Sequence, residues 1–494
     1  MRVLLLSILL IACICAKKDN VNVSNETLLE NLNVGRIVQI YQQFKGMAKK
    51  IITTIEPTVE KRKKLIKTFE NVTATLSKKS SNLTLDQIKA NMTGLFLFQG
   101  DITLTKSQAD DIQKDIEAQY KKLTEGKSGR TKRFAYRGSK YPKNRWNRGV
   151  HYYFHNSTTK PQQEAFRRAV KAWSNNTCVD FFEDDKAKNR VVVARSYFCS
   201  SFVGKIGGEQ AIYQAPYCDH FRGAAHALGH VLGLLHPMSR EDRDKHITVK
   251  GENILPPIIF QFLKQTNKTN NDYGLGYDLG SIMHSSLQSG AVKNTTVTLD
   301  PVDKNFMKTA PSETISFNDL RAVNIHYQCE ERCKNVTPPP KCQNGGYQHP
   351  RDCGKCLCPS GFAGTLCNER PRGCGNERNA TEEWQPLIDE LKNNKPDPLD
   401  GYSRCNYWIR SPDKTKIEIE IISFDNKSKT KAVFCNEAGV EIKTNKDPAL
   451  TGYRFCSKED VRTLKSSSNL VPVITYNRLA DESRVALKYR YVKA

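Results

Sequence analysis

The sequence predicts a multidomain protein, with a largely helical N-terminal segment, an α+β domain, a small disulfide-rich module and a C-terminal β-sandwich. Three observations lead to this prediction. The chain has 494 residues, which is too long for one hydrophobic core. Six of its sixteen cysteines lie within residues 333–367, and so short a segment must rely on disulfides for its stability. Later runs such as KIEIEII at 416–422 alternate apolar and polar residues, which is typical of β-sandwich strands.

The first element is a signal peptide, expected at residues 1–16. A charged start precedes a short apolar stretch that ends with the small residue Ala16. No later stretch approaches the roughly 20 apolar residues that cross a bilayer, so we expect no transmembrane segment. Removal of Cys13 and Cys15 with the signal leaves an even set of fourteen from sixteen cysteines, and glycosylation sequons recur from Asn22 to Asn426. These features predict a secreted, extracellular glycoprotein with paired cysteines.

The formal net charge of +24 restricts the class of partner. We expect no nucleic-acid partner, because the protein is predicted to be secreted. Lysines are spread along the whole chain rather than gathered into a stripe, which favours a merely solvated surface. Acidic matrix glycans remain an alternative, and the expected ligand is an extracellular protein or peptide.

Residues 17–133 are expected to form a propeptide. The segment lacks cysteine, and its apolar residues from Ile37 to Ile51 recur near a 3.6 period, as in an amphipathic helix. It ends in a basic tetrapeptide, RTKR, close to two glycines. A basic cluster in a flexible loop of a secreted protein is typical of a processing site, so we expect cleavage between Arg133 and Phe134.

Residues 134–330 are expected to fold as the α+β domain. The run WNRGVHYYF at 146–154 predicts a strand, and Phe166, Val170 and Trp173 mark one face of a helix. The boundaries expected for the remaining domains are 331–368 for the disulfide-rich module and 374–492 for the sandwich.

The strongest motif is GAAHALGHVLGLLHPMSREDRD at 223–244. His226 and His230 are four residues apart, so on a helix their rings project from one face and can chelate one ion. Gly233 can turn the chain, which lets His236 supply a third nitrogen. Three histidines and one open position describe a zinc site of the catalytic type, because a structural site is closed by a fourth protein ligand. The alternative is a buried helix with hydrogen-bonded histidines, but three of only ten histidines at ligand spacing around a glycine favour metal.

This motif resembles the HExxHxxGxxH motif of the metzincins, and its continuation SREDRD resembles that of the astacin family. The resemblance covers nearly the whole chain. Residues 95–101 (LFLFQGD) are similar to the FxGD switch of astacin propeptides, which implies that Asp101 caps the zinc before processing. Residues 277–284 (YDLGSIMH) match the methionine turn, with Met283 beneath the metal. The resemblance implies a zinc metalloendopeptidase with one Zn²⁺ per chain.

The cysteines extend the resemblance. Four of them fall where astacins place two disulfides, which implies the pairs Cys178–Cys329 and Cys199–Cys218. CPSGFAGTLC at 358–367 resembles the end of an EGF-like domain, and the last four cysteines fit the pattern of a CUB domain. The disulfide cysteines expected in these two domains are Cys333, Cys353, Cys342, Cys356, Cys358 and Cys367, then Cys374, Cys405, Cys435 and Cys456. The order of propeptide, protease, EGF and CUB is similar to that of nematode astacins.

Three residues depart from the family pattern, and all three bear on one mechanism. Ala227 follows the first histidine ligand, where the family has the glutamate that takes and delivers protons. Ser285 replaces a tyrosine that assists the oxyanion, and its hydroxyl is too short to reach the metal. Pro237 replaces the glutamate that usually receives the new N-terminus. We therefore expect zinc binding without an intact set of catalytic residues.

Two alternatives stay open. In the first, the chain is an active protease in which Glu241 or a group of the substrate replaces the missing base. In the second, it is an extracellular binding or adhesion protein that acts through its EGF-like and CUB domains. Calcium binding is undecided, because residues 325–333 lack the acidic cluster of calcium-binding EGF domains.

Overall fold

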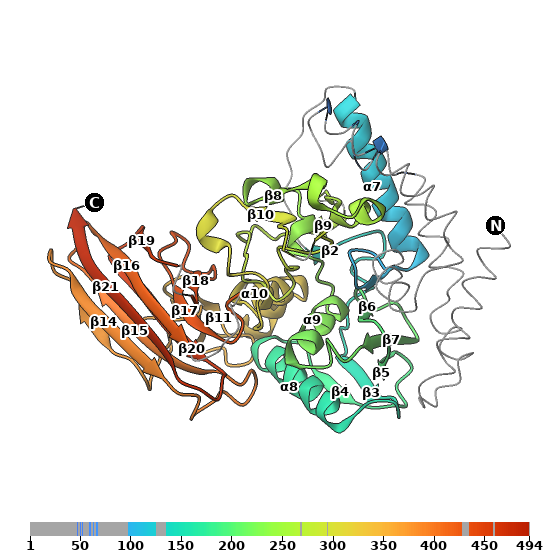
Figure 1. The fold of residues 1–494 in the computed structure, drawn as a ribbon. Coiled ribbons are helices and arrows are strands. Elements are labelled where there is room, and N and C mark those ends of the chain that lie inside the picture. Colours follow the sequence, from blue (N-terminus) through green and yellow to red (C-terminus); the bar gives the residue numbers. More distant parts are fainter. Residues whose placement is uncertain are drawn as a thin grey trace. The chain divides into compact units, whose positions relative to one another are not determined.

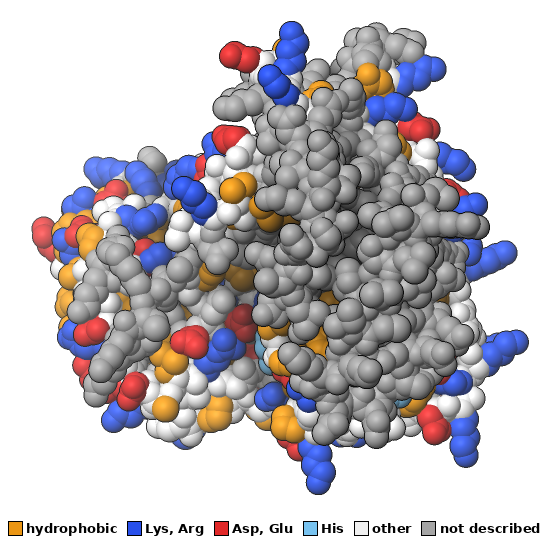
Figure 2. Space-filling view, turned by 45° about the vertical axis from the view of Figure 1, so that its right-hand side comes forward, with side chains coloured by type: hydrophobic (Ala, Val, Ile, Leu, Met, Phe, Trp, Pro, Cys, Tyr) orange, Lys and Arg blue, Asp and Glu red, His pale blue; other side chains and the backbone are white. Residues whose placement is uncertain are grey.

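The computed structural model describes residues 97–124, 135–266, 269–293, 295–426, 434–457 and 460–493, with eight separate positions between 47 and 67. The signal peptide, most of the helix expected at 37–51 and the processing site at Arg133 and Phe134 lie outside the described residues. None of the described helices has both the length and the apolar character needed to span a bilayer. On the face drawn in Figure 2, Lys and Arg side chains are dispersed among acidic ones rather than gathered into a stripe.

The chain divides into two compact units. The first consists of Met1–Phe166, Asp180–Asp272 and Gln288–Asp300, and the second of Arg167–Val179, Tyr273–Leu287 and Pro301–Ala494.

The first unit is built on a mixed six-stranded sheet with the order β1-β6-β7-β5-β3-β4 (Figure 1). Its strands are β1 (Ile102–Thr103), β3 (Val150–Phe154), β4 (Phe181–Glu183), β5 (Arg190–Arg195), β6 (Ser200–Phe202) and β7 (Glu209–Gln214). The central strand β5 pairs in parallel with both neighbours and buries the apolar run 191–194, as expected of a strand covered on both faces. The strand expected from residue 146 begins only at Val150, because a turn with Gly149 at φ +85° precedes it.

Three helices accompany this sheet: α7 (Lys106–Thr124), α8 (Lys160–Asn176), whose later turns belong to the second unit, and α9 (Phe221–Val231). Helix α9 packs against β6 and β7. Two small ribbons complete this part of the chain, β2 (Ala135–Tyr136) with β9 (Asn270–Asn271) and β8 (Ile247–Val249) with β10 (Leu299–Pro301). The short 3₁₀ turns are η1 (Pro237–Ser239), η2 (Arg243–Lys245), η3 (Gly251–Asn253) and η4 (Pro256–Phe262).

The second unit contains the helix α10 (Phe317–His326), which starts with a capping box of Ser316 and Asp319. The turns η5 (Lys304–Phe306) and η6 (Cys329–Cys333) flank this helix, and β11 (Tyr347–Gln348) pairs with β12 (Cys356–Leu357) in the disulfide-rich module. The disulfides of the whole described chain are Cys178–Cys329, Cys199–Cys218, Cys333–Cys353, Cys342–Cys356, Cys358–Cys367, Cys374–Cys405 and Cys435–Cys456.

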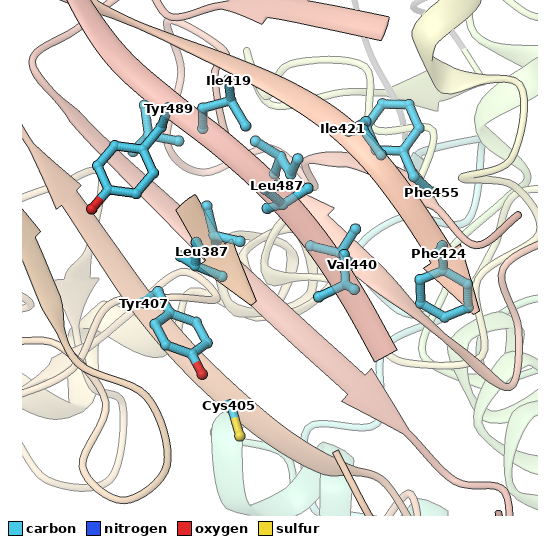
Figure 3. Close-up of a cluster of buried hydrophobic side chains, with 14 of the residues drawn as sticks. Leu387, Cys405, Tyr407, Ile419, Ile421, Phe424, Val440, Phe455, Leu487 and Tyr489 are labelled. Atoms are coloured by element: carbon cyan, nitrogen blue, oxygen red, sulfur yellow. The ribbon is translucent and has the colours of Figure 1, made fainter. Parts of the chain in front are cut away.

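The C-terminal part of the second unit is a sandwich of two sheets, as the alternating sequence predicts. One sheet has the order β13-β15-β20-β17-β18 and the other β14-β21-β16-β19. The strands are β13 (Glu377–Asn379), β14 (Gln385–Leu391), β15 (Ser403–Arg410), β16 (Thr415–Asn426), β17 (Ala438–Ile442), β18 (Tyr453–Phe455), β19 (Arg462–Lys465), β20 (Leu470–Asn477) and β21 (Ser483–Lys493). Figure 3 shows their inward side chains, such as Leu387, Ile419 and Leu487 from one sheet and Val440 and Phe455 from the other, meeting in one core.

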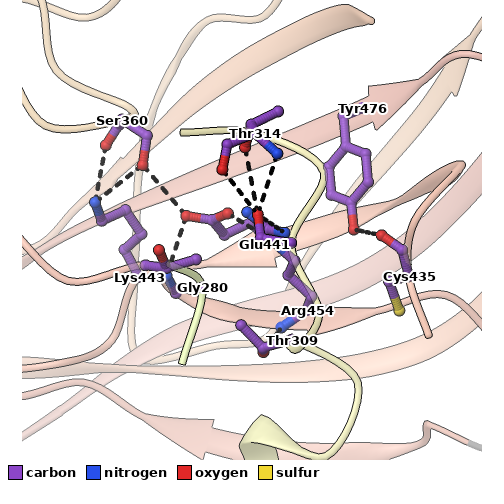
Figure 4. Close-up of polar contacts among 12 residues, drawn as sticks. Gly280, Thr309, Thr314, Ser360, Cys435, Glu441, Lys443, Arg454 and Tyr476 are labelled. Atoms are coloured by element: carbon purple, nitrogen blue, oxygen red, sulfur yellow. Dashed lines mark hydrogen bonds and ion pairs between the residues drawn. The ribbon is translucent and has the colours of Figure 1, made fainter. Parts of the chain in front are cut away.

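A buried polar cluster joins β17 and β18 to residues before the sandwich (Figure 4). Glu441 accepts hydrogen bonds from Arg454 Nε and the Gly452 amide, both at 3.0 Å, and from Ser360 Oγ at 3.3 Å. Lys443 Nζ donates to the Ser360 carbonyl at 3.1 Å. The Glu441 side chain is 7% exposed and that of its partner Arg454 is 12% exposed, so this ion pair lies largely out of water.

Removal of this carboxylate is expected to destabilise the second unit strongly. Glu441→Ala leaves the largely buried Arg454 without its anion, which costs about 3–5 kcal/mol. The matched control is Glu418→Ala, because Glu418 pairs at 2.9 Å with the partly exposed Arg490, and a surface pair contributes about 0–1 kcal/mol. Scanning calorimetry checks the difference, and equal shifts of the unfolding transition in both variants would contradict it.

Candidate metal centre

Helix α9 carries the first two predicted ligands. It begins after His220, whose ring Nδ1 caps the helix by accepting from the Gly223 amide at 3.4 Å. His226 and His230 lie one turn apart on the same face, and both rings are turned toward each other with centroids 4.7 Å apart.

Gly233 ends the helix and redirects the chain. Its φ of +102° lies in the region that favours glycine, and its amide donates to the His230 carbonyl at 2.8 Å. The chain then continues in extended conformation, so that His236 points back toward the helix before η1 begins at Pro237. The glycine therefore has the role that its spacing predicts.

The three imidazoles converge through their Nε2 atoms. His226 Nε2 lies 3.1 Å from His230 Nε2 and 3.2 Å from His236 Nε2. Nitrogen ligands about 2.0–2.1 Å from a tetrahedral zinc lie roughly 3.3 Å from one another, so the spacing fits one ion. His230 and His236 are almost fully buried, which keeps competing water away from their rings.

The hydrogen bonds of the Nδ1 atoms determine the tautomers of His230 and His236. His230 Nδ1 lies 2.8 Å from the Leu234 carbonyl oxygen, and His236 Nδ1 lies 3.0 Å from Gln99 Oε1. Because both partners are acceptors, each Nδ1 carries the proton and donates it, which leaves a lone pair on Nε2 for a metal.

Asp101 completes the centre from the N-terminal segment. One carboxylate oxygen, Oδ2, lies 2.7 Å from His226 Nε2. The other, Oδ1, lies 3.2 Å from His236 Nε2 and 3.5 Å from His230 Nε2. Oδ1 is buried and has no hydrogen-bond partner, although a buried carboxylate oxygen normally needs one. A cation among the four groups would satisfy it.

Protonation favours the same interpretation. Burial lowers the pKa of His236 to about 4 and also lowers the pKa of His226, so both rings are neutral at physiological pH. Burial alone would raise the pKa of Asp101, but the attraction of the three histidines lowers it well below its ordinary value. Neutral imidazoles and an ionised carboxylate are the forms in which these groups bind metal.

The donor set fits zinc. Three imidazole nitrogens and one carboxylate oxygen lie within 4.8 Å of one another, which is a tetrahedral set of the N and O ligands that zinc takes. Of the described residues, only one other group meets the same criterion, Cys374 and Cys405 with Asp389, and its two cysteines form a disulfide. Asp101, His226, His230 and His236 could therefore hold one metal ion.

Gln99 contacts the candidate centre, although the sequence alone does not single it out within the LFLFQGD motif. It holds a φ of +53°, and its side chain is 6% exposed. Its amide oxygen accepts the hydrogen bond that orients His236. This contact with His236 is visible only in the folded structure, because the FxGD pattern allows any residue at position 99.

Gln99→Ala is expected to weaken zinc binding by the unprocessed chain about 10- to 100-fold, because the ring of His236 loses the acceptor that orients it. Competition with a chromophoric chelator measures the affinity. Gln99→Glu is the matched control, since it keeps an acceptor at the same place and should bind zinc as the original chain does. Equal affinities for all three proteins would show that the Gln99 contact has no such role.

The remaining predicted residues lie in different places. Ala227 follows His226 on α9 and is 9% exposed. Pro237 opens η1, and Glu241 lies between η1 and η2. Met283 and Ser285 belong to the second unit, where Asp319 on α10 accepts from the Ile282 amide at 2.9 Å and from Ser281 Oγ at 2.5 Å. Within that unit the methionine turn is thus held by the N-terminal turn of α10.

Comparison with known proteins identifies two of the domains. Residues 138–328 match the family profile Astacin (Peptidase family M12A), and residues 382–491 match the CUB domain. Zinc metalloproteinase nas-31 of Caenorhabditis elegans is 39% identical over 411 residues, which cover 83% of this chain and 66% of that protein. Zinc metalloproteinase nas-29 of the same organism is 31% identical over 414 residues, covering 80% of this chain and 76% of that protein.

One solved structure that the comparison matches is high choriolytic enzyme 1, a hatching enzyme zinc-protease from Oryzias latipes. It is 22% identical, covers 39% of this chain and 94% of its own, and has a TM-score of 0.34. The sequence matches and the profile agree with the order of motifs along the chain. The chain belongs to the astacin family of zinc metalloproteinases and carries a CUB domain.

Proposed function

We propose that the protein is a secreted astacin homologue that binds one zinc ion but hydrolyses peptides poorly or not at all. The observation that carries this proposal is the contrast within α9. His226 and His230 have the geometry of metal ligands. Ala227, which directly follows His226, stands where the family has the glutamate that moves protons. Metal binding needs only the ligands, whereas hydrolysis also needs the carboxylate.

The missing chemistry is proton transfer. A zinc ion bound there would supply a water whose pKa falls to about 7. The chain must then accept the proton of that water and deliver a proton to the leaving amine, and the methyl group of Ala227 can do neither. Ser285 offers no phenol to a developing oxyanion. Loss of a general base costs about 10²- to 10⁴-fold in rate, and the two losses need not multiply.

We further propose that residues 17–133 act as a propeptide whose Asp101 holds the fourth position of the centre. The short contact of Asp101 with His226 supports this role, as does the place of the residue in the LFLFQGD motif. The disulfide-rich module is proposed to be EGF-like. Together with the CUB domain, it offers a surface for an extracellular protein or peptide ligand, and the many disulfides suit that compartment.

The kind of bond cleaved tests the proposed defect. An activated ester has a good leaving group, but an amide needs its nitrogen protonated. The test compares an ester and an amide substrate of the same sequence, after proteolysis has removed the N-terminal segment. We expect the original chain to cleave the ester much faster than the amide. In Ala227→Glu this preference should fall by about 10²-fold or more. An unchanged ratio would show that proton delivery is not what the chain lacks.

A further inference from the structure

The segment 97–124 contacts the domain that follows it far beyond the metal centre. We propose that this segment stays bound after the chain is cut between residues 124 and 135, so that the processed protein is a complex of two fragments. Asp101 and Gln99 would then remain at the histidines after cleavage. All the contacts that carry this proposal lie within the first unit.

The first contact is made by the backbone. β1 adds an edge strand to the sheet by pairing in parallel with β6, with Ile102 opposite Ser201 and Thr103 opposite Phe202. The Ser201 amide donates to the Asp101 carbonyl at 2.9 Å. If the segment left, β6 would expose unpaired backbone groups as a sheet edge, a feature that proteins usually protect.

The second contact is a shared apolar core. Its members from the N-terminal side are Met47, Phe98, Ile102, Leu104, Ala109, Ile112 and Ile116, and those from the following domain are Tyr136, Val203, Leu235 and Leu263. Ile112 and Ile116 lie one turn apart on α7 and are each 1% exposed. Departure of the segment would bring the buried faces of both partners into water, which disfavours release.

The third contact is a row of polar side chains on α7. Gln108, Asp111, Asp115 and Gln119 are spaced three, four and four residues apart, so they follow one another along the helix. Gln108 Nε2 donates to the Val203 carbonyl at 2.9 Å, and Gln119 Nε2 donates to the Lys264 carbonyl at 3.1 Å.

The two aspartates of this row accept several hydrogen bonds each. Asp111 Oδ2 accepts from Tyr136 Oη at 2.8 Å and from the amide and hydroxyl of Ser139, both at 2.9 Å. Asp115 is 3% exposed and accepts from the Thr266 amide at 2.6 Å and from Thr269 Oγ1 at 2.9 Å. Hydrogen bonds to an ionised carboxylate are roughly twice as strong as neutral ones.

A cut between residues 124 and 135 leaves all of these contacts in place, because none of them involves a residue of the cut segment. Each contact joins a residue before the cut to a residue after it. On the far side, the Tyr136 amide donates to the Gly233 carbonyl at 3.1 Å and β2 pairs with β9. The cut removes only the tether, whose effect is that of a millimolar effective concentration. Strand, core and polar row must then supply the affinity.

The test uses the full chain with a site-specific protease sequence placed within residues 125–134. The protein folds with the tether intact, is then cut, and is passed over a size-exclusion column at about 1 µM, where weak complexes separate. We expect the two fragments to elute together. Separate elution of the N-terminal fragment would overturn the proposal.

Neighbouring aspartates provide a matched comparison. Asp111→Ala should weaken the cut complex about 10- to 100-fold, because it removes hydrogen bonds to a charged group. Asp110→Ala makes the same change of charge one residue earlier on α7, where the described residues show no hydrogen bond to the side chain, and should leave the affinity unchanged. Asp115→Asn gives a second, milder probe of the row. Equal dissociation constants for all these proteins would refute the role of α7, and none of these outcomes depends on whether the chain hydrolyses peptides.

Discussion

Replacement of Ala227 with glutamate is expected to raise peptide hydrolysis by the protein freed of segment 97–124 about 10²- to 10⁴-fold. The metal ligands and the helix that carries them are already in place, since His226 and His230 converge at 3.1 Å. The substitution returns a carboxylate beside the first ligand, where it can accept a proton and then pass it to the leaving amine. Steady-state cleavage of a fluorogenic peptide measures the gain, after digestion has removed segment 97–124.

The matched control for this prediction is Ala227→Gln. Glutamine has nearly the shape of glutamate but cannot take up a proton at neutral pH, so this variant should stay at the rate of the original chain. Ala227→Glu combined with Ser285→Tyr should exceed Ala227→Glu alone, because an oxyanion donor is worth about 10²- to 10³-fold. A zinc-loaded Ala227→Glu variant that remains as slow as its glutamine control would count against the proposed cause of the defect.

Loss of the second ligand is the other change with a large expected effect. His230→Ala should reduce the zinc content from one ion per chain to almost none after dialysis. The reason is that His230 is 1% exposed and its Nε2 lies within the converging set, so no water or neighbouring group can easily replace it. Elemental analysis of purified protein measures the metal directly.

His246→Ala is the control for this loss. His246 follows α9 in the sequence, its side chain is 38% exposed, and it is not among the four groups of the centre. This variant should retain one zinc per chain. If His230→Ala also retained a full complement of zinc, the ion would have to be bound elsewhere and the assignment of the centre would be wrong.

The centre was largely predictable from the sequence because its parts are close together along the chain. A spacing of four residues places His226 and His230 on one helical face whatever the rest of the fold does. The φ of +102° at Gly233 explains why that residue had to be glycine. Asp101 lies far away in the sequence, and only the resemblance of its motif to a known switch indicated where it would go.

Contacts between distant segments could not be predicted in the same way. The polar row on α7 belongs to a segment expected only to be largely helical, and Gln99 stands at the variable position of the LFLFQGD motif. In the second unit, a Cβ on Gly280 would lie 2.3 Å from Thr451 Oγ1, so the loop before the methionine turn requires glycine where the sandwich approaches. Nothing local indicates that contact, because it depends on how two separately patterned segments pack.

One measurement tests both zinc binding by this chain and its proposed lack of peptide hydrolysis. Zinc content and casein cleavage are determined on the same preparation of the original chain, freed of segment 97–124 by digestion, beside Ala227→Glu treated identically. We predict about one zinc per chain in both proteins, with cleavage by the original chain close to the chelator-treated background and clear cleavage by the variant. Chelator-sensitive cleavage by the original chain, as fast as that of Ala227→Glu, would contradict this account and require another base in place of the missing glutamate.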